Sequence, residues 1–243
     1  MTNTTQFWGI VPAAGVGKRM NAHCPKQYLP LFRDHETVTC TVIEQTLHRL
    51  LSVDLFKKIV VAISVDDAYW PDLPIATHPV ILRAQGGRER ADSVLNALRA
   101  LEGLANENDW VLVHDAARPC ITKEEIELLI STLRDDVVGG ILALSSHDTL
   151  KEVEGKQITG TLNRNRIWRA LTPQMFRYGL LKKALEATQG NDAVTDEASA
   201  LEIQGFTPKI VEGRSDNIKI TRPEDLALAQ FYLTTQQSTT PHS

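Results

Sequence analysis

Two uninterrupted apolar runs constrain the fold of this chain more than any other feature. They occupy residues 58–63, which after Lys58 are apolar and rich in β-branched side chains, and residues 110–113. Such runs are typical of strands that are covered on both faces of a sheet. Amphipathic stretches with apolar residues at helical spacing separate them. Strands that alternate with such helices predict a parallel, doubly wound α/β sheet.

The other expected elements continue this alternation along the chain. Further strands are predicted at residues 7–11, 79–82, 139–144, 208–211 and 217–220. Helices are predicted at residues 38–51, 180–185, 196–203 and 223–233, and around Leu98 and Leu129. Two spacings predict helix starts: Thr122 with Glu125, and Thr221 with Glu224, each fit a capping box.

The length and composition set limits on the class of protein. A chain of 243 residues can bury a large core, so we expect one domain over residues 1–243, with a flexible Ser/Thr/Gln-rich tail at 235–243. The net charge of −4 argues against a nucleic-acid partner. Cys24, Cys40 and Cys120 form no close pair, which predicts a reducing compartment and a cytoplasmic location. No signal peptide or membrane span is visible, so we expect no membrane partner.

The alternation is interrupted at residues 145–174. Within this segment, residues 149–153 and 157–162 flank a Glu-Gly-Lys turn and predict a β-hairpin with two polar faces. Lone hairpins are marginally stable in water. We therefore expect an inserted arm that either moves as a flap or packs on a second copy of the chain.

A glycine-rich loop follows the first strand and reads PAAGVGKRM at residues 12–20, with PKQY at 25–28. Small residues allow close backbone approach, and exposed N–H groups beside cations favour a phosphate chain. A Walker A loop is excluded, because Pro12 and Arg19 stand where it needs Gly and Ser/Thr. Met20 replaces the third glycine of a dinucleotide fingerprint. The remaining alternative is an ordinary strand-to-helix loop with surface cations.

Two aspartates are candidates for a magnesium site. Asp115 follows the strand at 110–113, and ligands of open α/β sheets bind at this edge. A carboxylate that faces a phosphate-binding loop suits Mg²⁺, which takes few carboxylates and many phosphate oxygens. Asp216, three residues before Lys219, is the second candidate. The alternative for each is a turn or cap residue, which is weaker for Asp115 because Thr122 already caps the next helix.

Several other polar residues lie near predicted strand ends. Among the loop cations, Arg19 and Lys26 are favoured for function, and Lys18 is assigned to the surface. Two interpretations of the segment that contains Arg88, Arg90 and Ser93 stay open: a ribose or phosphate site, and an ordinary glycine turn into a helix. Ser93 has no visible base, which argues against a hydrolytic nucleophile. We assign His114 and the helix start at residues 195–197 to structure.

The motifs together resemble a known family. The loop at residues 12–28 is similar to the nucleotidyltransferase signature, and VHDAARP at 113–119 is similar to the signature of the methylerythritol phosphate cytidylyltransferases of the non-mevalonate isoprenoid pathway. Further segments match in order at 148–149, 164–165, 170–174 and 216–221, so the resemblance extends from about residue 10 to residue 233. Arg88 and Asn163 depart from the acidic residues that the family often has there.

The resemblance implies a Rossmann-like, mostly parallel nucleotidyltransferase fold and transfer of CMP from CTP to methylerythritol 4-phosphate, with release of pyrophosphate. It also implies a homodimer in which the arm at 145–174 embraces the partner, so that Arg118 and Thr149 serve the neighbouring site. The implied catalytic residues are Arg19, Lys26 and Lys219. The implied nucleotide site is Ala13, Ala14, Gly15, Gly87, Ser93 and Ala116. The implied substrate residues are Arg118, Thr149, Arg164 and Thr172, and the implied Mg²⁺ ligands are Asp115 and Asp216.

Other functions remain as alternatives. Ribitol phosphate cytidylyltransferases share the chemistry, although Arg164 with Thr172 favours methylerythritol phosphate. Nucleotide-sugar and molybdopterin nucleotidyltransferases share the glycine-rich loop but are expected to lack the segment at 114–119. A non-catalytic nucleotide sensor would keep the loop without needing Asp115, Asp216 and Lys219. A Rossmann dehydrogenase is disfavoured by Met20.

Overall fold

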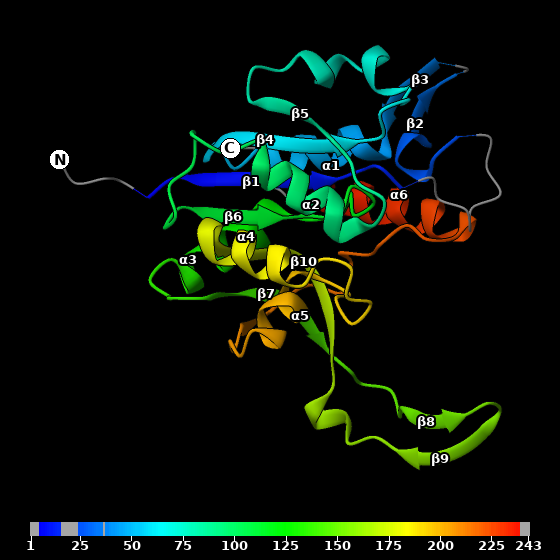
Figure 1. The fold of residues 1–243 in the computed structure, drawn as a ribbon. Helices are drawn as coiled ribbons and strands as arrows, with labels where there is room; N and C mark the ends of the chain where they lie inside the picture. Colours follow the sequence, from blue (N-terminus) through cyan, green and yellow to red (C-terminus); the bar gives the residue numbers. More distant parts are fainter. Residues whose placement is uncertain (1–4, 16–23, 36, 239–243) are drawn as a thin grey trace.

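A seven-stranded central sheet organises the fold, which a computed structural model describes for residues 5–15, 24–35 and 37–238 (Figure 1). Its strands, in chain order, are β1 (Phe7–Pro12), β4 (Phe56–Ile63), β5 (Ile81–Gln85), β6 (Trp110–Val113), β7 (Gly139–Ser145), β10 (Trp168–Arg177) and β11 (Lys209–Glu212). Their order across the sheet is β11-β7-β10-β6-β1-β4-β5. Only β10 pairs antiparallel with its neighbours β6 and β7, so the predicted mostly parallel α/β sheet is confirmed.

Helices cover both faces of this sheet. They are α1 (Val42–Leu51), α2 (Arg90–Arg99), α3 (Lys123–Leu133), α4 (Tyr178–Ala187), α5 (Glu197–Ile203) and α6 (Pro223–Ser238). Short 3-10 helices occupy Lys26–Tyr28, Trp70–Asp72, Pro74–Thr77 and Arg164–Arg166. Among the described residues, no helix is both long and apolar enough to pass through a bilayer.

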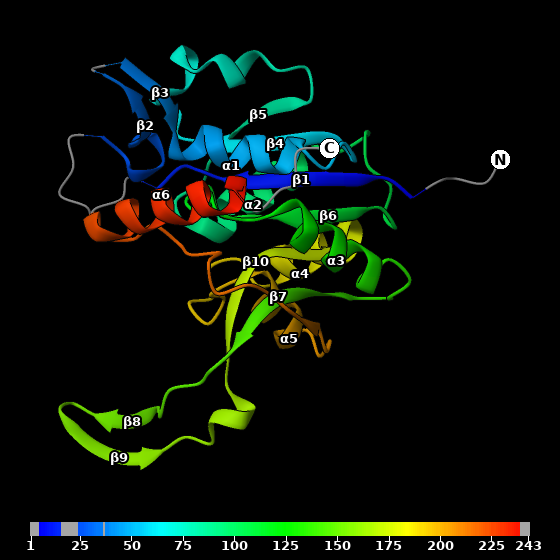
Figure 2. The same cartoon turned by 180° about the vertical axis from the view of Figure 1, so that it is seen from behind.

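The apolar run in β4 feeds two separate cores. Ile59 and Val61 pack with α1 and α3 on one face of the sheet, and this face is turned toward the viewer in Figure 2. Val60 and Ala62 pack with α2, α4 and α5 on the other face. Successive side chains of a strand point to opposite faces, so a continuous apolar run is what a strand between two helical layers requires. A third, smaller core joins α6 to the hairpin of β2 (Pro30–Asp34) and β3 (Thr37–Thr41).

The start of α1 differs from the prediction. Residues 38–41 belong to β3, and the helix begins at Val42 after an N-cap at Thr41, which forms a capping box with Glu44. The β-branched residues before Thr41 favour an extended backbone, and the cap then fixes where the helix starts. The box at Thr122 and Glu125 is confirmed.

The end of the chain also differs from the prediction. The segment 217–220 is not in a strand; instead, Ile220 N–H donates to the carbonyl of Ala117 at 2.8 Å. Asp225, and not Glu224, accepts hydrogen bonds from Thr221 at the start of α6. Helix α6 continues to Ser238, so residues 235–238 are helical rather than a flexible tail, and residues 239–243 lie outside the described residues.

The predicted hairpin arm is confirmed as a projection from the sheet. It consists of β8 (Lys151–Glu154) and β9 (Gln157–Thr161) and extends well away from the body of the molecule (Figure 1). The arm is shorter than the predicted 145–174, because β7 ends at Ser145 and β10 begins at Trp168. Strand β10 contains Pro173, and proline argues against a strand because it is expected only at strand edges or irregularities. Here it lies at a register shift between Ala170 and Gln174.

Candidate functional site

A cavity of about 520 Å³ opens at the carboxyl ends of β1 and β6. From β1 the chain continues toward the edge of the sheet at β5, and from β6 it continues toward the opposite edge at β11. The neighbouring strands β1 and β6 therefore form the switch point at which open α/β sheets bind ligands. The six residues predicted to bind the nucleotide all line it, together with Lys26, Asp115 and Lys219. Arg19 lies outside the described residues.

Gln27 fixes the first wall of the cavity. Its buried side-chain amide donates from Nε2 to the carbonyl oxygens of Ala13 at 2.7 Å and Gly15 at 3.1 Å. These two bonds attach Gln27 to the loop on both sides of Ala14. Gln27 was not predicted as a site residue, although it lies inside the quoted PKQY segment.

The opposite wall is the turn into α2. A Cβ atom on Gly86 would collide with the Cβ atom of Ala14, so the two loops approach each other as only glycine allows. The buried hydroxyl of Ser93 accepts from Gly87 N–H at 3.0 Å and donates to the carbonyl of Glu89 at 3.1 Å. Ser93 thus shapes the turn, and Arg88 and Arg90 reach the cavity beside it.

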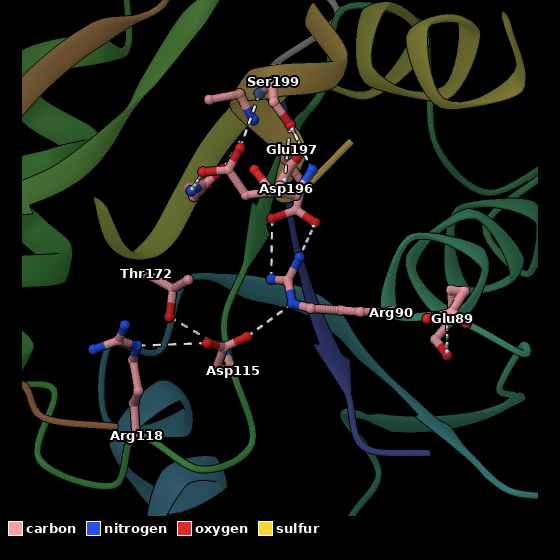
Figure 3. Close-up of polar contacts among 12 residues, drawn as sticks. Glu89, Arg90, Asp115, Arg118, Thr172, Asp196, Glu197 and Ser199 are labelled. Carbon is pink, nitrogen blue, oxygen red and sulfur yellow. Dashed lines mark hydrogen bonds and ion pairs between the residues drawn. The ribbon is translucent and has the colours of Figure 1, made fainter. Parts of the chain in front are cut away.

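Asp115 lies at the cavity among three cations, of which Figure 3 shows Arg90 and Arg118. Oδ1 accepts from Arg90 Nε at 2.9 Å, whereas Oδ2 lies 2.7 Å from Lys219 Nζ and 3.5 Å from Arg118 Nε. Burial alone would raise the pKa of this carboxyl, but the three cations hold it well below its ordinary range. Asp115 is therefore ionised at neutral pH.

Arg90 bridges Asp115 to a second buried carboxylate. Its NH1 and NH2 donate to the two oxygens of Glu197 at 2.6 Å and 3.1 Å. Burial acts to lower the pKa of Arg90, but the two carboxylates outweigh it and raise the pKa, so the guanidinium stays charged. The sequence-based assignment to helix capping is right for Asp196, which caps α5, but incomplete for Glu197. A buried acid one residue after a cap gives no signal of its own in the sequence.

A chain of hydrogen bonds behind Asp115 fixes its backbone. The amide of Asp115 donates to Thr172 Oγ1 at 3.1 Å, and Thr172 Oγ1 lies 3.0 Å from His114 Nδ1. His114 Nε2 lies 3.0 Å from the carbonyl oxygen of Arg118, which only accepts, so Nε2 carries the proton and Nδ1 accepts from Thr172. Burial is the main reason that the pKa of His114 falls to about 4, and the ring is neutral.

The residues predicted for the polyol phosphate are not gathered at the cavity of this one chain. Thr172 and Arg118 are buried behind Asp115, and Arg118 NH1 donates to the carbonyl of Asn217 at 2.8 Å. Thr149 and Arg164 are exposed on the arm, where Arg164 NH1 donates to the carbonyl of His147 at 3.1 Å. None of the four lines the cavity.

Asp216 is also absent from the cavity lining. Its carboxylate accepts from Arg214 at 2.9 Å and 2.7 Å and from Gln236 of α6 at 3.0 Å. The described part of the chain has no group of three or more acidic, His or Cys side chains suited to a metal ion. Asp115 is thus the one predicted metal ligand that reaches the cavity. Lys26 also lines the cavity, and its Nζ donates to the carbonyl of Ile220 at 3.0 Å.

Comparison with known proteins decides the family. The model of the family described as IspD: 2-C-methyl-D-erythritol 4-phosphate cytidylyltransferase matches residues 8–235. The chain belongs to this family. A relative with that name from Pseudomonas putida (strain GB-1) is 52% identical over 230 residues, which cover 93% of this chain and 95% of the relative. Another from Vibrio vulnificus (strain YJ016) is 50% identical over 235 residues, which cover 96% and 97%.

Solved structures of the family share the fold. The crystal structure of the Francisella tularensis member superposes with a TM-score of 0.80 at 38% identity and covers 94% of this chain and all of that one, 100%. The structure titled 4-diphosphocytidyl-2C-methyl-D-erythritol synthase superposes with a TM-score of 0.78 at 35% identity, over 94% and 98% of the two chains. The resemblance seen in the motifs is therefore confirmed over nearly the whole chain.

Proposed function

We propose that this chain transfers CMP from CTP to 2-C-methyl-D-erythritol 4-phosphate, which gives CDP-methylerythritol and pyrophosphate for isoprenoid precursor biosynthesis. The observation that carries this proposal is the cavity at the switch point. It combines a glycine-rich loop with Lys26, Asp115 and Lys219 in a chain of the cytidylyltransferase family. The family model and the relatives named above favour methylerythritol phosphate over ribitol phosphate as the acceptor.

The chemistry needs positioned charge rather than a protein nucleophile. A phosphate oxygen of the acceptor forms a bond to the α-phosphorus of CTP, and the bond to the bridging oxygen of pyrophosphate breaks. Lys26 and Lys219, from two segments that line the cavity, stabilise the charge that accumulates on the α-phosphate and on the leaving group. We propose the same role for Arg19.

We further propose that Mg²⁺ accompanies CTP at Asp115. Mg²⁺ is held in many enzymes by one or two carboxylates and by phosphate oxygens of the substrate, and Asp115 at the cavity can supply one such carboxylate. When bound, the ion would neutralise part of the triphosphate charge. Asp216 does not line the cavity, and its carboxylate bonds to Arg214 and Gln236, so we assign the ion to Asp115.

The acceptor site is proposed to form between two copies of the chain. Thr149 and Arg164 lie on an exposed arm that extends from the body, and Val153 and Ile158 of the arm are 56% and 66% exposed. A second copy would cover these apolar side chains and receive the arm beside its own cluster of Asp115, Arg118 and Thr172. Light scattering at micromolar concentration should give the mass of a dimer, and a monomer would contradict the proposal.

One assay tests the reaction. Pyrophosphate release from CTP is measured with Mg²⁺ and either methylerythritol phosphate or ribitol phosphate. We expect release with the first acceptor. Release with ribitol phosphate alone would move the assignment to that relative, and no release with either would overturn it. We also propose a cytoplasmic location, which the three free cysteines support, and which fractionation of cells tests.

A further inference from the structure

Arg90 lies between two buried carboxylates from different parts of the chain (Figure 3). Its Nε donates to Asp115 at 2.9 Å, while NH1 and NH2, which form the fork of the guanidinium, both donate to Glu197. The side chain of Glu197 is only 1% exposed. Planar, two-point pairing of this kind fixes the guanidinium in both position and orientation.

The carboxylate of Glu197 is itself held in place from the sheet. Gln174 Nε2 donates to Asp196 Oδ2 at 2.9 Å, and Gln174 Oε1 accepts from Ala198 N–H at 3.0 Å. These two bonds attach the first turn of α5 to β10. Gln174 pairs in register with Val113, which lies two residues before Asp115. Glu197 and Asp115 are thus located by the same pair of strands.

The charges show what Glu197 changes at the site. Arg90, Arg118 and Lys219 all face Asp115, and Arg90 also lines the cavity. Without the negative charge of Glu197, NH1 and NH2 of Arg90 could pair with both oxygens of Asp115 or turn toward a triphosphate. Either movement would reorient the carboxylate and increase the positive charge offered to the nucleotide.

We propose that Glu197 is a positioning residue that acts through Arg90: it holds the guanidinium against Oδ1 of Asp115 and out of the triphosphate space. Asp115 then keeps one orientation in the cavity. This inference rests on the proposed cytidylyl transfer, and it adds a residue that does not line the cavity.

The substitution Glu197→Gln tests the role, because it removes the charge and keeps the shape. We expect kcat to fall by about tenfold or more, with CTP affinity in the absence of divalent cations unchanged or up to about fivefold tighter. Kinetics and isothermal titration calorimetry measure the two effects. Damage to the fold would instead weaken CTP binding together with kcat, and that result, or a wild-type kcat, would overturn the proposal.

The matched control is Glu186→Gln, which removes one negative charge from an exposed pair with Lys182 on α4. It should change neither kcat nor CTP affinity. If Glu197→Gln does not fold, Glu197→Asp keeps the charge on a shorter side chain, and an intermediate kcat with unchanged CTP affinity is expected. Wild-type kcat in that variant would overturn the proposal.

A double-mutant cycle shows whether the effect passes through Arg90. In an Arg90→Lys background, which lacks the fork, Glu197→Gln should have little further effect on kcat or on CTP affinity. Additive effects would overturn the proposal. If the wild-type chain binds CTP but transfers no CMP, the proposed function fails, and the cycle measured on CTP affinity still tests the pairing of Arg90 with Glu197.

Discussion

The loop at residues 113–118 and the hairpin of β8 and β9 present opposite solutions to the same problem of holding polar backbone in place. Every residue of the loop is buried, and its polar groups bond to α2, β10 and the segment 217–220. Every residue of β8 is exposed, and the hairpin is paired only within itself.

This difference separates what one chain can complete from what it cannot. A buried carboxylate such as Asp115 is tolerated only when cations and hydrogen bonds replace its water, so the loop is ordered by its own chain. An isolated hairpin with exposed apolar side chains gains little stability from within. The loop around Asp115 is therefore stabilised within one chain, whereas the exposed hairpin is the surface that we propose a second copy covers.

The largest effect is expected from Asp115→Asn, which breaks the loop side of this comparison. Arg118 and Lys219 would lose the counter-charge of Asp115, and Arg90 would keep only Glu197, which should lower the free energy of unfolding by about 3–5 kcal/mol. Urea unfolding measures this change. Asp148→Asn, at an exposed position beside the arm, should stay within about 0.5 kcal/mol of wild type. Similar losses in the two variants would contradict the comparison.

Lys26→Ala should come next, with its effect on rate rather than on folding. Removal of a cation from the cavity should lower kcat by about 100- to 1,000-fold, the usual cost of losing one preorganised donor to a developing charge. Pyrophosphate release measures the rate. The control is Lys18→Ala, in the same loop but outside the described residues, which should do little; equal losses would refute the ranking of these cations.

The neutral ring of His114 should make the loop sensitive to acid. Its pKa is about 4 in the folded chain and near 6.5 when unfolded, so the unfolded chain takes up the proton first as the pH falls. The contribution of the neutral ring to the free energy of unfolding is fully present above pH 6.5. As the pH falls to 4, the free energy of unfolding should decrease by about 3 kcal/mol. Urea unfolding across this window should show a shallower pH dependence for His114→Asn, and an unchanged slope would contradict the assignment.

The smallest effect on the folded monomer is expected in the arm. The pair Val153→Ser and Ile158→Ser removes exposed apolar groups, so the free energy of unfolding of the monomer should change by less than about 0.5 kcal/mol. Dimer dissociation, followed by light scattering on dilution, should shift to higher protein concentration. A large loss of monomer stability would show that the arm is supported by its own chain after all.

Local sequence signals located most elements but not all of their limits. The continuous run in β4 and the box at Thr122 predicted their elements because burial on two faces and helix capping depend on neighbouring residues. The prediction of a helix at 38–51 was wrong for residues 38–41, which form β3 instead. That strand depends on pairing with β2, which the local sequence does not show. Residues 217–220 have a strand-like pattern but bond to the loop at Ala117 instead of the sheet.

The sequence by itself determined the α/β sheet, the glycine-rich loop and the position of Asp115 at a strand end, because apolar runs, small residues and strand-end acids act locally. The resemblance to the family supplied the six nucleotide residues that line the cavity. Only the tertiary structure decided that Asp115 is held by three cations, that Glu197 controls Arg90, and that Asp216 bonds away from the cavity. These pairings join residues up to 107 positions apart in the chain. Charge neutralisation in a buried site depends on distances in space, which spacing along the sequence does not encode.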